Sequence, residues 1–246
     1  MKNPFTISLL TAAFAALTFS SPSALGQAIF SSGHGDIGVG YAAGEFDPHW
    51  HLHSGAIVDG SPLGADEEFA PADLNAQTFA TRTSPSGLSS IIGVADGTVI
   101  SAAGSSLYQP NLGFGTEELT PSDWIGPITV ALTSWNVPIG ANFALYTTNL
   151  AGTTVVDRVF STFAPGSTDF SNSFTMTPGD HMHFQWGFSE LGTYQLELTW
   201  SGTHAVDGAI STSENLAVQV IPEPSTYALL GLGLVGILWA LRRRTA

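Results

Sequence analysis

The chain has 246 residues, with 20 Asp or Glu against six Lys or Arg, and contains no cysteine. Of the basic residues, only Arg82 and Arg158 lie between residues 27 and 221. The same part contains 19 of the acidic residues, so its net charge is near −17. Such a surface repels nucleic acids and anionic lipids and attracts cations, which excludes nucleic acid as a partner. Without cysteine no disulfide forms, so the fold depends on packing or on a bound metal.

The first 26 residues have the pattern of a secretory signal peptide. Lys2 supplies a positive charge, an apolar segment runs from Ile7 to Phe19, and small residues precede a cleavage position after Gly26. Cleavage after Ala28 is the alternative position, and a retained N-terminal anchor is the alternative interpretation. A signal peptide predicts export through the inner membrane with signal peptidase as a partner. Residues 27–221 are long enough for one domain with a substantial core.

Most of this domain has the pattern of strands separated by turns. From Tyr194 to Trp200, apolar residues alternate with polar ones, as in a strand with one buried face and one solvated face. Turns rich in Pro, Gly and Asn separate further segments of this kind. We expect these additional strands at Ile128–Trp135, Ala141–Thr147, Thr153–Phe160, Asp180–Phe188 and Glu214–Ile221.

The segment from Asp59 to Thr120 is less regular, and its composition predicts long loops with one short helix near Pro71–Thr81. No amphipathic helix of three turns and no long internal repeat occurs between the two ends. Several short strands with intervening turns predict an all-β fold, an antiparallel β-sandwich of the Ig-like or jelly-roll-like kind. An N-terminal signal helix and a C-terminal transmembrane helix would flank it.

Six of the seven histidines fall into three groups that share a spacing of two residues between metal-ligating side chains. On a strand, residues two apart point to the same face, about 7 Å apart along the chain, so their side chains can converge on one ion. Neutral imidazole suits zinc, copper, nickel or iron, and a carboxylate adds a hard, negative ligand. The groups are His34-Gly35-Asp36, His49-Trp50-His51-Leu52-His53 and His181-Met182-His183.

A site with three histidines and Asp36 fits this chemistry, but three other interpretations stay open. The H-x-H pattern also arises from polar alternation on an exposed strand. The group from His49 to His53 is also typical of a loop that binds metal weakly and adventitiously. Imidazoles beside Trp50 and Trp186 can pack and form hydrogen bonds without any ligand.

The last 25 residues contain three parts in a fixed order. Pro222-Glu223-Pro224 precedes an uncharged apolar segment, Ser225–Leu241, and then the basic tail Arg242-Arg243-Arg244. At 1.5 Å per residue the apolar segment reaches about 25 Å as a helix, near the short limit for crossing a bilayer core roughly 30 Å thick. The arginines favour a cytoplasmic C-terminus. A buried core helix is the alternative, but the segment has no polar face.

This order resembles the PEP-CTERM sorting signal, in which a Pro-Glu-Pro motif precedes a transmembrane helix and a basic cluster. The resemblance covers Ile221 to Arg244. It implies recognition by an exosortase, cleavage near the motif, and release or transfer to the surface of a Gram-negative, often matrix-producing bacterium.

A second resemblance covers both ends of the domain. Gly33-His34-Gly35-Asp36-Ile37-Gly38-Val39, together with an H-x-H-x-x-W-x-F-x-x-x-G-x-Y pattern from His181 to Tyr194, resembles the choice-of-anchor M-type surface domain. That group is related to actinobacterial surface-anchored repeats, which are often encoded near metal-type ABC transporters. The resemblance leaves residues 59–120 unmatched and implies a metal-related role.

Carried over residue by residue, the second resemblance implies a divalent transition metal, such as zinc, copper or manganese. Its ligands would be His34, Asp36, His181 and His183. The group from His49 to His53 lies outside the motif and is not assigned to this site. The remaining motif residues are expected to be core and turn residues of a hairpin: Trp186, Phe188, Gly192 and Tyr194.

The sequence contains no G-x-S-x-G, no H-E-x-x-H, no phosphate-binding loop and no cysteine nucleophile. Adjacent acids at Glu67-Glu68 and Glu117-Glu118 are typical of a solvated surface. We therefore expect a non-enzymatic surface or matrix protein, with a structural or binding domain that functions in adhesion or a biofilm and has exopolysaccharide as a candidate partner. The alternative is a surface protein that binds a transition metal.

Overall fold

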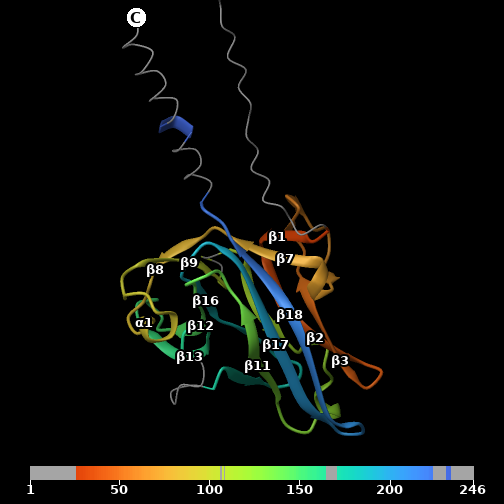
Figure 1. The fold of residues 1–246 in the computed structure, drawn as a ribbon. Coiled ribbons are helices and arrows are strands. Elements are labelled where there is room, and N and C mark those ends of the chain that lie inside the picture. Colours follow the sequence, from red (N-terminus) through yellow and green to blue (C-terminus); the bar gives the residue numbers. More distant parts are fainter. Residues whose placement is uncertain (1–25, 106, 108, 165–170, 224–230, 234–246) are drawn as a thin grey trace, which may run out of the picture.

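Alternating apolar and polar residues place most of the chain in strands, which form three sheets (Figure 1). The structure is a computed structural model that describes residues 26–105, 107, 109–164, 171–223 and 231–233. The fold is mostly β, as the sequence predicted. The expectation of a purely antiparallel sandwich is corrected, because two of the three sheets contain parallel pairs.

The largest sheet has eight strands, and it is mixed because β7 runs parallel to both of its neighbours, β1 and β18. Its other neighbouring pairs are antiparallel. In order across the sheet, the strands are β14 (Ser173–Met176), β11 (Ile128–Asn136), β17 (Gly192–His204), β18 (Gly208–Val220), β7 (Leu74–Thr78), β1 (Ala28–Ser32), β4 (Ile57–Val58) and β5 (Ser61–Pro62).

The second sheet, which we call the histidine sheet, has five strands and one parallel pair, β10 with β2. In order, its strands are β15 (His181–His183), β10 (Asn111–Gly115), β2 (His34–Ala42), β3 (Glu45–Leu52) and β6 (Glu67–Phe69). The third sheet is antiparallel throughout and contains β13 (Val155–Ser161), β12 (Phe143–Thr148), β16 (Gln185–Phe188), β9 (Val99–Ala103) and β8 (Thr81–Thr83).

The short helix expected near Pro71–Thr81 is present only at the start of that range. A single 3-10 turn, η1 (Pro71–Asp73), starts at the proline, and the chain then continues as β7. Along β7 the buried residues alternate with partly buried ones, and this period of two places the segment between β1 and β18. Between residues 26 and 223, the described part of the chain also contains the short helices α1 (Ser89–Ile92) and η2 (Pro121–Asp123).

Residues 59–120 also contain more regular structure than long loops, since β5 to β10 all lie there. The strands expected farther along the chain are present, with ends shifted by a few residues. Asp180–Phe188 differs, because it divides into β15 and β16, which belong to different sheets. β16 and β17 also belong to different sheets, so they do not form the expected hairpin. Trp186, Phe188 and Tyr194 are nevertheless buried core residues, as predicted.

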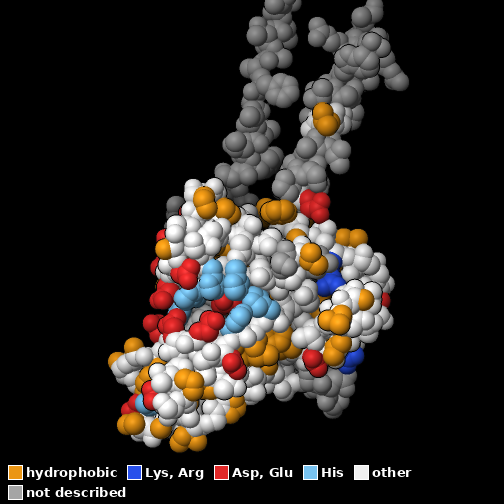
Figure 2. Space-filling model, turned by 180° about the vertical axis from the view of Figure 1, so that it is seen from behind, with side chains coloured by type: hydrophobic (Ala, Val, Ile, Leu, Met, Phe, Trp, Pro, Cys, Tyr) orange, Lys and Arg blue, Asp and Glu red, His pale blue; other side chains and the backbone are white. Residues whose placement is uncertain are grey.

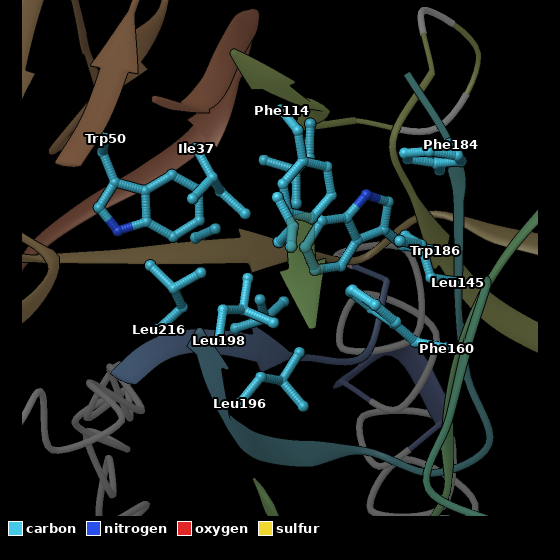
Figure 3. Packing of buried hydrophobic residues seen from close by; sticks show 14 of the residues in the cluster. Ile37, Trp50, Phe114, Leu145, Phe160, Phe184, Trp186, Leu196, Leu198 and Leu216 are labelled. Atoms are coloured by element: carbon cyan, nitrogen blue, oxygen red, sulfur yellow. The ribbon is translucent and has the colours of Figure 1, made fainter. Parts of the chain in front are cut away.

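One hydrophobic core connects the three sheets (Figure 3). In that view, Ile37 and Trp50 of the histidine sheet lie opposite Leu198 and Leu216 of the largest sheet. Phe114 of β10 stacks on Trp186 of β16, with ring centroids 5.7 Å apart. The histidine sheet therefore packs one face into the core, which leaves its other face for polar residues.

Within the described residues, no helix is long and apolar enough to cross a membrane. The transmembrane segment expected at 225–241 lies outside those residues except for 231–233. The expected signal peptide likewise lies outside them, apart from Gly26.

Replacing Leu198 with Ala tests the position of this core. Leu198 is 1% exposed, and its truncation should lower the free energy of unfolding by about 2–5 kcal/mol. Leu150 is fully exposed, so Leu150→Ala is the matched control and should change stability by less than about 0.5 kcal/mol. Denaturant unfolding measures both variants, and equal losses would contradict the assignment of the core.

Candidate metal centre

The polar face of the histidine sheet follows from the alternation of side chains along β2. Ile37 and Val39 point into the core, so His34, Asp36 and Gly38 occupy the opposite face. Figure 2 shows the histidine side chains of this region gathered into one continuous patch, with acidic side chains beside it.

Strand register brings the histidine groups together in two neighbouring rows across this face. In each row, residues on adjacent strands are directly paired, so their side chains lie on the same face. The first row contains His183, Gly113, Asp36, His51 and Glu68, and the second contains His181, Gly115, Gly38 and His49.

Three imidazoles surround the carboxylate of Asp36, and we call His34, Asp36, His53 and His183 the Asp36 site. Nε2 of His34 lies 3.0 Å from Nε2 of His183 and 3.3 Å from Oδ2 of Asp36. Nε2 of His53 lies 3.1 Å from the same Oδ2. Ligand atoms bound tetrahedrally to zinc at 2.0–2.1 Å are roughly 3.3 Å apart. The separations around His34 therefore suit a bound ion, and suitable ligand atoms of His34, Asp36 and His53 lie within 4.8 Å of one another.

Asp36 is the most informative residue of this site, because it is 1% exposed. Its Oδ1 atom has no hydrogen-bond partner among the described residues and lies 4.0 Å from Nε2 of His183. A buried carboxylate oxygen without a partner costs free energy. A cation held between Asp36 and the imidazoles would remove that cost.

The electrostatics of the site favour the metal-binding protonation states of Asp36 and His183, but favour the protonated form of His34 in the absence of a metal. Burial raises the pKa of Asp36, but hydrogen bonds and charge interactions with His34, His53 and His183 outweigh burial, so the pKa is lowered. Burial lowers the pKa of His183, which favours its neutral form. The hydrogen bond to Asp36 raises the pKa of His34. An anionic Asp36 and a neutral His183 both offer electron pairs to a cation.

Glycines beneath the site leave room for these side chains. A Cβ atom on Gly113 would lie 2.0 Å from Oδ1 of Asp36 and 2.9 Å from Cε1 of His183. A Cβ atom on Gly38 would lie 2.7 Å from Nε2 of His49. The small residues between the histidine groups therefore form the floor of the polar face.

Of the four ligands that sequence analysis assigned, the structure brings His34, Asp36 and His183 into contact. His181 lies at the margin, with its ring centroid 5.9 Å from that of His34 and its Nδ1 3.6 Å from Oε1 of Glu117. Suitable ligand atoms of His34, His181 and His183 nevertheless lie within 4.8 Å of one another.

His53 was not assigned to the site from the sequence, yet its ring stacks on His34 with centroids 4.2 Å apart. The contact follows from the pairing of β2 with β3. A tight turn at Ala43 and Gly44, both with positive φ, makes β2 and β3 an antiparallel pair. This register places the backbone N–H of His53 3.1 Å from the carbonyl oxygen of His34.

The beginning of the sorting motif follows β18 directly. The backbone N–H of Ile221 donates to the carbonyl oxygen of Thr78 at 2.9 Å. The Thr81 hydroxyl donates to Oε1 of Glu223 at 2.7 Å. Pro222 is also described, whereas Pro224 and the basic tail, Arg242, Arg243 and Arg244, lie outside the described residues.

Comparison with protein families matches residues 220–244 to the PEP-CTERM protein-sorting motif. This motif implies an exported, surface-associated protein that is sorted and processed by an exosortase. No curated protein and no solved structure matches the chain.

Replacing Gly113 with Ala tests the glycine floor. The added methyl group would collide with Asp36 and His183, so we expect unfolding to become easier by about 1–3 kcal/mol. Metal-induced stabilisation should also weaken, because Asp36 must move. Gly64→Ala is the control, since a Cβ atom there would meet no atom within 4 Å. Similar unfolding curves and metal shifts for the two variants would contradict this role for Gly113.

Proposed function

We propose that the protein is a non-enzymatic, exosortase-sorted surface protein whose domain binds a divalent transition metal at the Asp36 site. The observation that carries this proposal is the buried Asp36 carboxylate, which has an unpartnered oxygen and three imidazole nitrogens around it. Three nitrogen ligands and one carboxylate suit zinc or copper, and manganese is a harder alternative.

The position of the Asp36 site supports capture or buffering of metal from outside the cell. His34, His53 and His183 are each about one-third exposed, so an ion reaches them without any opening of the core. The strongly acidic surface attracts cations toward this face. A bound ion would also connect the edge strand β15 to β2, which couples metal binding to stability.

The sorting motif supports a second role that is compatible with metal binding. An exported β-domain carrying this motif would suit a structural protein of the cell surface or biofilm matrix, with exopolysaccharide as a partner. The middle domain's resemblance to the choice-of-anchor M family supports the metal-binding role on His34, Asp36, His181 and His183. Our proposal differs in one ligand: His53 completes the Asp36 site, and His181 flanks it.

Metal titration of the full chain, purified in detergent and treated with chelator, tests the proposal. Zinc or copper at a hundredfold excess over Kd should stabilise the fold by about 2.7 kcal/mol, which a thermal shift detects. The double variant His181→Ala/His183→Ala should weaken binding by at least about tenfold.

His204→Ala is the matched control, because His204 lies outside the patch and pairs with Asp207 at 2.8 Å. This variant should bind metal as the wild type does. A wild-type protein without stoichiometric metal, whose melting temperature ignores zinc, copper and manganese, would rule out the metal-binding function.

Changing Pro222 and Glu223 to Ala tests sorting. In a host with an exosortase, the variant should remain uncut in the inner membrane, as judged by fractionation and mass. Thr81→Val removes the hydroxyl that contacts Glu223 but keeps the motif, so it should still be cleaved. Normal cleavage of the Pro222→Ala/Glu223→Ala variant would refute the assignment of the motif.

A further inference from the structure

We infer a second cation site on the same face of the histidine sheet, which we call the His49 site, formed by His49, His51, Glu68 and Glu118. Suitable ligand atoms of these four residues lie within 4.8 Å of one another. None of them belongs to the Asp36 site, so this inference goes beyond the proposed function. It rests on the hydrogen bonding and burial of His49.

The tautomer of His49 is fixed by its backbone contact. Nδ1 of His49 lies 3.0 Å from the carbonyl oxygen of Asp47, and a carbonyl oxygen only accepts hydrogen bonds. Nδ1 therefore carries the proton, and in the neutral ring Nε2 presents a lone pair. Metal-binding histidines are commonly oriented in this way by a carbonyl on the other ring nitrogen.

The Nε2 atom of His49 faces a carboxylate oxygen without forming a hydrogen bond to it. His49 is only 6% exposed, and its Nε2 has no hydrogen-bond partner among the described residues. The same atom nevertheless lies 2.8 Å from Oε1 of Glu118. A lone pair and an anionic oxygen at this separation repel each other, unless Nε2 binds a proton or a metal ion that the oxygen also contacts. We take it to be a metal ion, because ligand atoms of His51 and Glu68 converge on the same position.

His51 and Glu68 complete the group. Nδ1 of His51 lies 3.6 Å from Oε1 of Glu118, the oxygen that also faces His49. Glu68 is paired with His51 across β3 and β6, so the two side chains lie on the same face. Together these residues surround one position with two imidazoles and two carboxylates.

Glycines on β2 make room for this group, as Gly113 of β10 does for the Asp36 site. A Cβ atom on Gly38 would lie 2.7 Å from Nε2 of His49, and one on Gly40 would lie 2.9 Å from Oε2 of Glu118. Both glycines are buried beneath the ligands. The polar side chains therefore lie over positions that only glycine can occupy without displacing them.

The composition of the His49 site predicts its metal. Two carboxylates balance a divalent charge, and oxygen ligands favour harder ions than three imidazoles do. We therefore assign the His49 site to manganese or zinc, and expect it to prefer manganese more than the Asp36 site does. The competing arrangement is an ion pair between a doubly protonated His49 and Glu118, with no metal.

The test is manganese and zinc stoichiometry of the chelator-treated full chain in detergent, followed by calorimetry and, for manganese, by electron paramagnetic resonance. The wild type should bind two equivalents. Glu118→Gln keeps the side-chain shape but removes the charge, and it should weaken one equivalent by at least about tenfold. His49→Ala should remove the same equivalent, and His183→Ala should remove the other.

The outcomes separate the two sites. Suppose that the wild type binds one equivalent of metal, which is lost in His183→Ala but unchanged in Glu118→Gln. This result overturns the His49 site and leaves the proposed function intact. One equivalent lost only in Glu118→Gln and His49→Ala supports the His49 site and overturns the Asp36 site. If His49→Ala fails to fold, Glu118→Gln decides. No binding by the wild type refutes both sites, and leaves the ion pair of His49 with Glu118.

Discussion

The pleat of the histidine sheet is the constraint on which both candidate sites depend. Because side chains alternate, Ile37 and Trp50 anchor one face in the common core, and this fixes the positions of His34 and Asp36 on the other. His34, His49 and His51 are therefore held by strands whose opposite side is buried. A bound ion would meet ligands that are already arranged, which reduces the entropy lost on binding.

Asp36 illustrates how the fold tolerates a charged group in a nearly inaccessible position. One of its oxygens is hydrogen-bonded to His53 and lies close to His34, while the other has no hydrogen bond. The protein environment thus offsets only part of the cost of removing this carboxylate from water. His49 presents the same kind of incomplete pairing one row away, beside Glu118. Both incompletely paired groups lie on the face rich in imidazole, where the cations that we propose would complete their pairing.

Local pattern predicted the parts of this arrangement that depend on local geometry. The spacing of two placed His34 and Asp36 on one face, and the alternation in 194–200 predicted the core strand β17. The contact between His34 and His183 spans 149 residues and requires β10 to lie between β2 and β15, which no local pattern specifies. The parallel pairs of β7 were missed for the same reason, because partners distant in sequence are set by burial. The β2–β3 register was missed as well, because its turn places Ala43 at a positive φ that alanine seldom adopts.

The hydrogen bond between Thr81 and Glu223 has a consequence for processing. Only Ile221 separates the end of β18 from Pro222, so a protease that binds the motif works within a few ångströms of the folded β-domain. An enzyme cleft deep enough to surround Glu223 would have to detach this glutamate from β8 first. The last contacts of the chain, at Thr78 and Thr81, would then open before the motif is bound.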